Sequence, residues 1–503
     1  MKKYLAVLFG VLFILSFAVT AFAVHDTPAS EETAVVASSG AAKITLGGKI
    51  IVRGWYFDNV GAQVKTLDAD TFGEINTGAL PVDTGSQSFY TTSATLTVDA
   101  KIGDNVQGFM ELESSSVDSN NSGSVYWGTY DSKGDMELKF RQLWIQYTGA
   151  GLLGAPSGIK IGHMPIVLGE KQFLNNERFG DDAILLWVDP MKEMHIAIGT
   201  TKLNEGNTTI GLNNSTDDLD GYMALMTYML NKDNTVGINY LLASSNGNLP
   251  SLQDWTNGAD PGYNNCETLS FQNAGIHANG KLYGISYAAE ADMNFGKAEN
   301  VLGTGSDAKF KGWGVFAKLG YMLDPVNIRG SFAMGSGADK FKDFDDGDLD
   351  VDEFQTLQGT DATGATSRPI HYTQIYERSI RTAAAEAVVS TYPGGNIRST
   401  GIANTTYFNL GFDVNPIKEV SVSVDGFFLQ ATETGAWEDI VGNSVDDSLG
   451  WEIDSKINWK IAKNLTYFIE AGIFKPGDFY KDAFGDDVDE TVTQAVHGLM
   501  LTF

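Results

Sequence analysis

The sequence predicts an all-β protein, a transmembrane, antiparallel, up-and-down β-barrel of about 18 strands, with 16 as the alternative. Three observations predict this fold class. Short segments in which apolar and polar residues alternate recur along the whole chain. The links between these segments fall into a short and a long class. The chain also ends on an alternating strand whose last residue, Phe503, is aromatic.

The C-terminal segment shows the third of these observations in detail. Leu499, Leu501 and Phe503 fall on one face of residues 491–503, and His497 interrupts the same apolar row. We interpret these three apolar residues as a barrel-assembly signal on the last strand, because a transmembrane strand presents its apolar face to lipid.

The N-terminal segment predicts export. Lys2 and Lys3 precede an unbroken apolar stretch at residues 4–19, and the small residues Ala21 and Ala23 follow it. This is the pattern of a cleaved secretory signal peptide. We therefore expect a signal peptide over residues 1–23, a short periplasmic segment over 24–42 and the barrel over 43–503.

Alternation within the segments has the period of a β-strand. Val420, Val422 and Val424, for example, lie opposite Ser421 and Ser423. Because such a strand crosses a bilayer with only about ten alternating residues, a mean hydropathy of −0.11 is compatible with a membrane protein. Aromatic residues near the strand ends predict two interfacial girdles: Trp55, Tyr56, Tyr90, Tyr147, Tyr240, Tyr321, Tyr407, Trp451, Trp459 and Tyr467.

The links alternate between two classes, eight short and nine long. The short links contain turn residues, at 103–105, 149–158, 189–190, 231–234, 279–280, 324–325, 415–416 and 462–464. The long links are polar and lie near 58–87, 114–135, 165–182, 203–218, 245–267, 296–308, 336–403, 432–447 and 476–490. Eighteen strands, short periplasmic turns and long extracellular loops follow from this order.

Charge and motif content exclude several classes of function. The formal net charge of −29 disfavours a nucleic-acid partner, since phosphate binding needs a basic face. Cys266 is the single cysteine, so neither an internal disulfide nor a CxxC metal site can form. No catalytic motif is present and the six histidines are scattered. We expect no enzymatic activity and no cofactor.

Charged residues opposite the apolar rows are the candidates for the pore lining. The basic candidates are Lys49, Arg53, Lys160, Lys318, Arg329 and Lys456. The acidic candidates are Asp99, Glu111, Glu113, Glu290, Asp292, Asp413, Asp425, Glu452, Asp454 and Glu470. Charged rows inside a barrel set ion preference, so this balance predicts a pore that weakly favours cations or tolerates zwitterions. Pairing of these charges across neighbouring strands, as support for the barrel, is the alternative.

The longest link, residues 336–403, contains two distinct segments. Residues 343–353 are strongly acidic, but Lys342 and Phe344 occupy positions where an EF-hand needs oxygen ligands. A looser calcium site and a solvated acidic loop are the two interpretations, with the candidate ligands Asp346, Asp348, Asp350 and Glu353. Residues 370–392 have helical spacing and predict either a constriction folded into the pore or an external lid.

Three stretches resemble a known family. Residues 448–480 (SLGWEIDSKINWKIAKNLTYFIEAGIFKPGDFY), 175–186 (NNERFGDDAILL) and 45–59 are similar to porins of the alginate-export superfamily. The resemblance implies an 18-stranded outer-membrane channel. Members that move that polyanion have a strongly basic lumen, from which the acidic lean of this chain departs, so alginate is not implied as the substrate.

These observations favour a passive diffusion channel in the outer membrane of a Gram-negative bacterium, carrying ions and small polar solutes. The alternatives are a barrel that sheathes a partner such as an outer-membrane cytochrome, an exporter of polysaccharide, and a secreted soluble β-protein. The expected partners are outer-membrane lipid and lipopolysaccharide, the secretion and barrel-assembly machinery, and the solutes themselves. Assembly as a homotrimer stays open.

Overall fold

The computed structural model describes sixteen stretches of the chain: residues 36–39, 42–60, 63–65, 76–79, 81, 83–116, 125–127, 136–152, 154–177, 180–204, 218–246, 266–300, 305–340, 350–358, 372–380 and 401–503. The predicted signal peptide, with Ala21 and Ala23, lies outside these residues, as does most of the segment 24–42. The predicted divisions of the chain at residues 23 and 42 therefore stay predictions.

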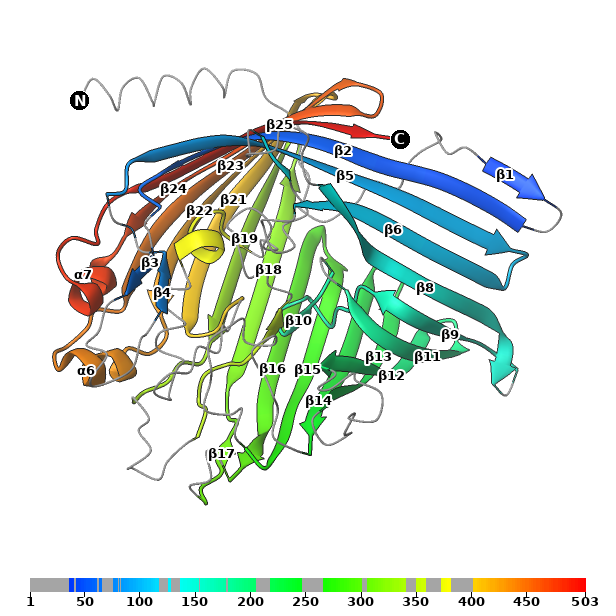
Figure 1. Ribbon diagram of the computed structural model, residues 1–503, viewed down its shortest axis with the longest axis horizontal. Coiled ribbons are helices and arrows are strands. Elements are labelled where there is room, and N and C mark those ends of the chain that lie inside the picture. The colour runs from blue at the N-terminus through cyan, green and yellow to red at the C-terminus, as the bar shows by residue number, and fades with distance from the viewer. Residues whose placement is uncertain are drawn as a thin grey trace.

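The fold is a closed antiparallel barrel of eighteen strands, in which each strand pairs with its neighbours along the chain (Figure 1). The strands are β2 (Ala42–Asp58), β5 (Ser86–Ile102), β6 (Val106–Ser116), β8 (Met136–Leu152), β9 (Ala155–Met164), β11 (Asp181–Met191), β12 (Met194–Asn204), β13 (Leu219–Asn231), β14 (Asn234–Ser245), β15 (Thr268–Leu282), β16 (Ile285–Glu299), β18 (Trp313–Leu323), β19 (Val326–Gly335), β21 (Thr405–Ile417), β22 (Val420–Ala431), β23 (Ser448–Ala462), β24 (Leu465–Pro476) and β25 (Val492–Thr502). The predicted fold class is confirmed, and the alternative of sixteen strands is wrong.

The first and last strands close the ring. β2 pairs with β25 from Lys49 opposite Thr502 to Asp58 opposite Thr493. Beyond β25, the amide of Phe503 donates to the Gly48 carbonyl at 3.0 Å, and the Gly48 amide donates to the Phe503 carbonyl at 2.7 Å. Figure 1 shows β25 running alongside β2. Closure leaves no strand edge to face lipid, where unpaired backbone groups are costly.

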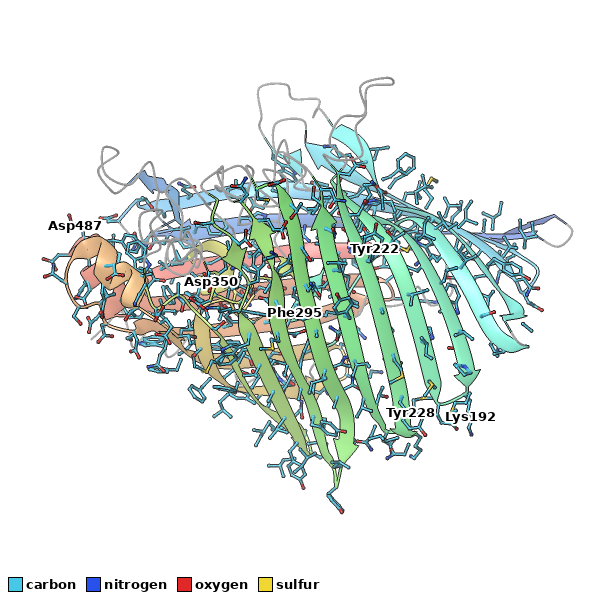
Figure 2. The ribbon with its side chains drawn as sticks, turned by 90° about the horizontal axis from the view of Figure 1, so that it is seen from below. Lys192, Tyr222, Tyr228, Phe295, Asp350 and Asp487 are labelled. Carbon is cyan, nitrogen blue, oxygen red and sulfur yellow. The ribbon has the colours of Figure 1, made fainter. Side chains whose placement is uncertain are left out.

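Links at one end of the barrel contain two or three residues, and links at the other end contain at least thirteen. Lys192 marks the short-link end in Figure 2, and Asp487 lies at the opposite end. Three predicted turns lie inside strands, because the actual turns are at 192–193, 283–284 and 418–419. Pro190 and Pro416 fall where the ladder shifts register, and an irregular ladder tolerates a residue without an N–H donor.

The outer face of the barrel is apolar. Ile145, Ile276 and Leu410 project from it with 67%, 61% and 68% of their surface exposed. Leu499 and Leu501 of the predicted assembly signal, together with Phe503, lie on this face. An apolar exterior on a closed barrel is suited to lipid acyl chains. No helix in the described stretches is long and apolar enough to cross a membrane.

Two aromatic residues predicted for the girdles face inward instead. Trp55 is 3% exposed, stacks on Phe57 and donates from Nε1 to Thr91 Oγ1 at 2.9 Å. Tyr407 is 2% exposed and stacks on Tyr372. The position of an aromatic residue near a strand end therefore does not show whether its side chain points outward or inward. That direction alternates from one residue of the strand to the next.

Short elements accompany the barrel. β1 (Val36–Ser39), β7 (Val125–Tyr126) and β17 (Ala308–Lys309) pair with barrel strands, while β3 (Gln63–Lys65) with β4 (Asn76–Ala79) and β10 (Leu174–Asn175) with β20 (Leu357–Gln358) form two separate small sheets. Helices α6 (Gly435–Val441) and α7 (Asp478–Phe484) lie in two long links, and the π-helical turn η3 (Tyr376–Ile380) lies in the longest.

Candidate pore constriction

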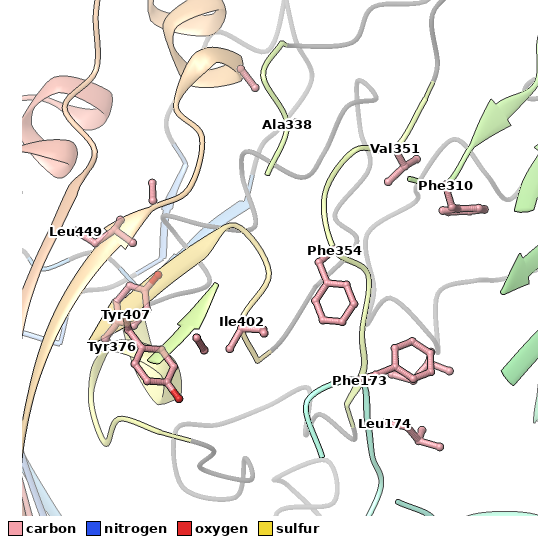
Figure 3. Packing of buried hydrophobic residues seen from close by; sticks show 14 of the residues in the cluster. Phe173, Leu174, Phe310, Ala338, Val351, Phe354, Tyr376, Ile402, Tyr407 and Leu449 are labelled. Carbon is pink, nitrogen blue, oxygen red and sulfur yellow. The ribbon is translucent and has the colours of Figure 1, made fainter. Parts of the chain in front are cut away.

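Segments of the long links fold into the barrel and pack against its inner wall. A buried hydrophobic cluster joins Phe173 and Leu174 of the β9–β11 link to Phe354 and Ile402 of the β19–β21 link (Figure 3). Phe173 contacts Phe271, an inward-facing residue of β15, with ring centroids 6.1 Å apart. These links therefore narrow the interior that the strands enclose.

The two links are joined to each other by backbone contacts. β10 and β20 pair in parallel, and the Leu357 amide donates to the Phe173 carbonyl at 2.8 Å. The Gln355 amide donates to Oδ1 of Asn294, an inward residue of β16, at 2.7 Å. Because buried backbone groups need partners, these bonds hold an irregular segment away from water inside the barrel.

A glycine on β18 makes room for this segment. A Cβ at Gly314 would lie 2.7 Å from the Phe354 ring, which is fully buried. Gly312 has the Glu353 carbonyl oxygen 2.2 Å from its Cβ position. Real Cβ contacts of this length do not occur, so the close approach of residues 353–354 to the wall depends on these glycines.

A third segment, residues 372–380, also lies inside the barrel. The ring of Tyr372 stacks on that of Tyr407 with centroids 4.6 Å apart, and the Tyr372 hydroxyl donates to the Gly401 carbonyl at 2.9 Å. Ile375 and Tyr376 are fully buried. The described part of the predicted helical segment thus lies within the barrel rather than over it. Residues 381–392 lie outside the described stretches.

Two carboxylates of β23 hold this segment by its backbone. The Glu452 carboxylate accepts the Ile375 amide at 2.6 Å and the Tyr376 amide at 2.8 Å. Asp454, two residues further on the same strand face, accepts the Gln374 amide at 3.0 Å. Bonds from amides to charged carboxylates are stronger than neutral ones. The three consecutive backbone N–H groups of residues 374–376 therefore anchor the segment 372–380 to the carboxylates of Glu452 and Asp454.

The β9–β11 link is anchored in the same manner on β16. Oε2 of Glu290 accepts the backbone amides of Glu170 and Gln172, the second at 3.3 Å. Gly169 leaves space for the carboxylate, since its Cβ position is 2.6 Å from Glu290 Oε1. Asp292 again follows two residues later on the same face. Of this acidic pair, the β9–β11 link is therefore fixed by Glu290 alone, whereas residues 374–376 are held by both Glu452 and Asp454.

Arg329 of β19 connects three strands on the inner wall. Its Nε donates to Asp413 Oδ2 at 2.7 Å, and its Nη1 and Nη2 donate to the two Asp425 oxygens at 3.0 and 2.9 Å. A Cβ at Gly411 would lie 2.1 Å from Asp425 Oδ1, so the glycine opens the space that the contact needs. Bidentate pairing of this kind fixes both geometry and charge.

All sixteen pore-lining candidates lie on the strand faces opposite the apolar exterior. Strand register places on the inner face Lys49, Arg53, Asp99, Glu111, Glu113, Lys160, Glu290, Asp292, Lys318, Arg329, Asp413, Asp425, Glu452, Asp454, Lys456 and Glu470. Several pair across neighbouring strands, as Lys456 does with Glu470 at 2.5 Å. Their function in permeation stays a prediction.

Burial separates the acidic from the basic candidates. Six of the ten acidic side chains are buried, at 0–7% exposure: Glu111, Glu290, Asp292, Asp413, Glu452 and Asp454. None of the six basic side chains is buried. Lys160 lies over the Trp144 ring at 3.8 Å. Among these sixteen candidates, the charges that are not buried are therefore mainly basic, whereas the full count of six against ten leans acidic.

The sequence reasoning missed Arg141 on β8. Its Nη1 donates to Glu111 Oε1 at 3.0 Å, and Gln142 donates to the other oxygen at 2.7 Å. The ladder shifts register between Glu111 and Leu112, so strict alternation fails at this point. Two outward residues separated by three positions, Phe140 and Leu143, are the sequence signal of the bulge.

The candidate calcium ligands are divided. Asp350 forms an ion pair with Lys311 at 2.6 Å and accepts the Lys309 amide at 3.1 Å. Glu353 is buried. Asp346 and Asp348 lie outside the described residues. In the described stretches, no group of three or more His, Cys, Asp or Glu side chains is placed to hold a metal ion.

A closed barrel with an apolar exterior, a charged inner wall and inward-folded links has the architecture of an outer-membrane porin. Residues 264–494 match the family model described as Alginate export. No curated protein matches. Of the three stretches that resemble alginate-export porins, residues 448–480 lie within this match, and residues 175–186 and 45–59 lie outside it.

Solved structures with this fold are porins of Pseudomonas aeruginosa. OccK2 (OpdF) has a TM-score of 0.50 and 9% identity, over 91% of this chain and 98% of that chain. OccK3 (OpdO) has a TM-score of 0.48 and 10% identity, over 91% and 95%. OccK5 (OpdH) has a TM-score of 0.47 and 10% identity, over 91% and 98%. The chain is therefore similar in fold to an outer-membrane porin.

Proposed function

We propose that the barrel is a passive diffusion channel whose water-facing wall is net basic, so that small anions and zwitterions pass more readily than cations. The burial of the inner charges carries this proposal. All six basic candidates are partly exposed, whereas only Asp99, Glu113, Asp425 and Glu470 among the acidic candidates are. Selectivity in a wide pore follows the potential at the solvated wall.

The buried carboxylates contribute less to that potential than their number suggests. Glu452 is bonded to two backbone amides, and Asp413 is paired with Arg329. Lys49, Lys160 and Lys318 form no ion pair with a carboxylate of the described residues within 4.0 Å. Their charges are therefore the ones available to a permeating solute.

Ion selectivity tests the proposal directly. Purified protein in planar bilayers, with a tenfold gradient of potassium chloride, should give a reversal potential of the sign for anion preference. The preference should weaken at high salt, because mobile ions screen wall charges over about 3 Å at 1 M. A reversal potential of the cation-selective sign at low salt would contradict the proposal.

Export of an acidic polysaccharide is a second candidate, favoured by the family model over residues 264–494. A basic wall suits a polyanion as well as a small anion. The inward links favour small solutes, since three segments are hydrogen-bonded across the interior. Single-channel current recordings with added uronic-acid oligomers distinguish the two functions. Brief blockades of the current whose duration falls as the voltage rises indicate that the oligomer passes through the pore. The absence of such blockades favours a channel for small solutes.

A further inference from the structure

Four polar side chains converge on the inner wall where β14, β15 and β16 lie side by side. They come from neighbouring positions of the three strands, with Asn239 opposite Gly275 on β15 and Gly275 opposite Asp292 on β16. The group consists of Asn239, Asn273, Glu290 and Asp292. We refer to these four residues as the β14–β16 oxygen cluster.

All four side chains are buried, and most of their polar atoms lack hydrogen bonds. Their exposed fractions are 4%, 0%, 3% and 5% in sequence order. The amide groups of Asn239 and Asn273, both Asp292 oxygens and Glu290 Oε1 have no hydrogen-bond partner. Buried polar atoms are nearly always bonded, so a group of this size without partners indicates a ligand.

The unpaired atoms are close to one another. A Cβ at Gly275 would lie 2.3 Å from Asp292 Oδ1, 2.5 Å from Asn239 Nδ2 and 3.0 Å from Asn239 Oδ1. The Glu290 carboxyl group and the amides of Asn239 and Asn273 are all directed at the Asp292 carboxyl group, without hydrogen bonds of acceptable geometry. Since the two ends of an asparagine amide are assigned and not observed, each amide can present its oxygen.

The cluster also lacks a positive side chain. No lysine or arginine of the described residues forms an ion pair with Glu290 or Asp292. His277 lies opposite Glu290, but its ring is directed toward β14, with Nε2 2.3 Å from the Cβ position of Gly237. Elsewhere on the wall Arg329 neutralises a comparable pair of carboxylates. Two adjacent buried carboxyl groups need either a compensating cation or a shared proton.

We propose that the β14–β16 oxygen cluster binds a calcium ion. The donor set consists of two carboxylates and two amides, which is the hard, all-oxygen set that calcium prefers. A divalent ion matches the two negative charges, and calcium accepts irregular geometry where magnesium requires an octahedron. The cluster contains only two acidic side chains, and its other two donors are asparagine amides. It is therefore compatible with the finding that no three His, Cys, Asp or Glu side chains of the described residues are grouped around a metal position.

The bound ion also fixes a pore segment. Glu290 is shared, because its Oε2 accepts the amides of Glu170 and Gln172 from the β9–β11 link, while Oε1 faces the cluster. Calcium would therefore stabilise the inward position of this link. This inference is independent of the proposed ion preference, which rests on the exposed lysines.

Calcium titration of full-length protein, extracted from outer membranes in detergent and stripped with EGTA, tests the site. Wild-type protein should bind calcium by isothermal titration calorimetry, and its thermal unfolding temperature should rise with added calcium, because a ligand of the native state stabilises it. Asp292→Asn should weaken the tightest site by at least about tenfold and remove the rise in unfolding temperature.

Two controls separate this site from other acidic groups. Glu470→Gln removes one inner-wall carboxylate of β24 and should leave binding unchanged. The triple variant Asp346→Asn, Asp348→Asn, Asp350→Asn should retain the tightest site. Asn239→Ala, which removes a donor without changing charge, should also weaken binding and serves if Asp292→Asn does not fold. Absence of calcium binding in wild type, or loss only in the triple variant, would overturn the proposal.

Discussion

Several inward carboxylates of the barrel have a specific form of compensation at the residue scale. Asp413 and Asp425 share one guanidinium, Glu452 accepts two backbone amides, and Glu111 binds Arg141 with Gln142. A buried charge without such partners is strongly destabilising. The inner wall therefore tolerates many acidic residues without presenting them to the lumen.

Removal of Arg329 should destabilise the barrel more than removal of a surface charge. Arg329→Ala leaves Asp413 and Asp425 facing each other without a cation, and loss of one partner of a buried ion pair costs about 3–5 kcal/mol. Urea unfolding followed by tryptophan fluorescence measures the change. Arg329→Lys should lie between wild type and Arg329→Ala, because an ammonium cannot bond both carboxylates bidentately. Equal stability of all three proteins would contradict this account.

Cys266 should be unreactive in the folded protein. The thiol is fully buried in the link before β15, and burial raises its pKa to about 11. At pH 8 about one thiol in a thousand would be ionised even with free access. Maleimide labelling should therefore be slow at pH 8 and complete after heating in SDS. Rapid labelling of the native protein would show that the link opens.

The sequence could predict that the charged candidates point to the inside of the barrel, but it could not predict which of them are buried there. Period-two alternation assigned all sixteen charged candidates to the inner face, because parity is a local property of a strand. Burial depends on segments that arrive from distant links, such as residues 372–376 over Glu452. Arg141 was missed because a bulge shifts parity within β8.

At the element scale, the inward links differ from the strands in how their backbone is satisfied. A barrel strand bonds to two neighbours, whereas residues 374–376 donate to side chains of β23. The sequence predicted a helix over residues 370–392. The described part contains the π-helical turn η3, and the amides of residues 374–376 are bonded to Asp454 and Glu452, since the first amides of a helical segment have no carbonyl within it.

Weakening the anchor on β23 should release this segment. Glu452→Gln replaces an anionic acceptor of two amides by an amide that presents only one acceptor. We expect a higher mean single-channel conductance with more current fluctuation in planar bilayers. Glu470→Gln, which removes a carboxylate from the neighbouring strand but none that accepts the amides of residues 374–376, should leave the current fluctuation as in wild type. Identical traces from both variants would refute the anchoring role.

At the scale of the whole molecule, closure of the barrel was predictable because it follows from the even number of strands counted along the chain. An even number of strands with both chain ends on the short-link side requires that β2 meet β25, as it does from Lys49 to Asp58. Turn positions were less predictable, since Asn279 and Gly280 have turn chemistry yet lie within β15. Ladder continuity with β14 and β16 outweighs this local preference.

The net charge of the chain and the charge balance of its partly exposed inner-wall candidates have opposite signs, and this difference leads to the last prediction. The chain carries −29 overall, while the partly exposed inner candidates comprise six basic and four acidic residues. The triple variant Lys49→Gln, Lys160→Gln, Lys318→Gln removes three wall cations that form no ion pair with the described residues. Its reversal potential in a salt gradient should shift toward cation preference by tens of millivolts at low salt, because three cations are replaced by neutral side chains while the four partly exposed carboxylates remain. The matched control is Lys192→Gln, Lys232→Gln, Lys418→Gln, which removes equal charge from the short links and should shift the potential less. An equal shift in both variants would assign selectivity to the barrel mouth instead of the inner wall.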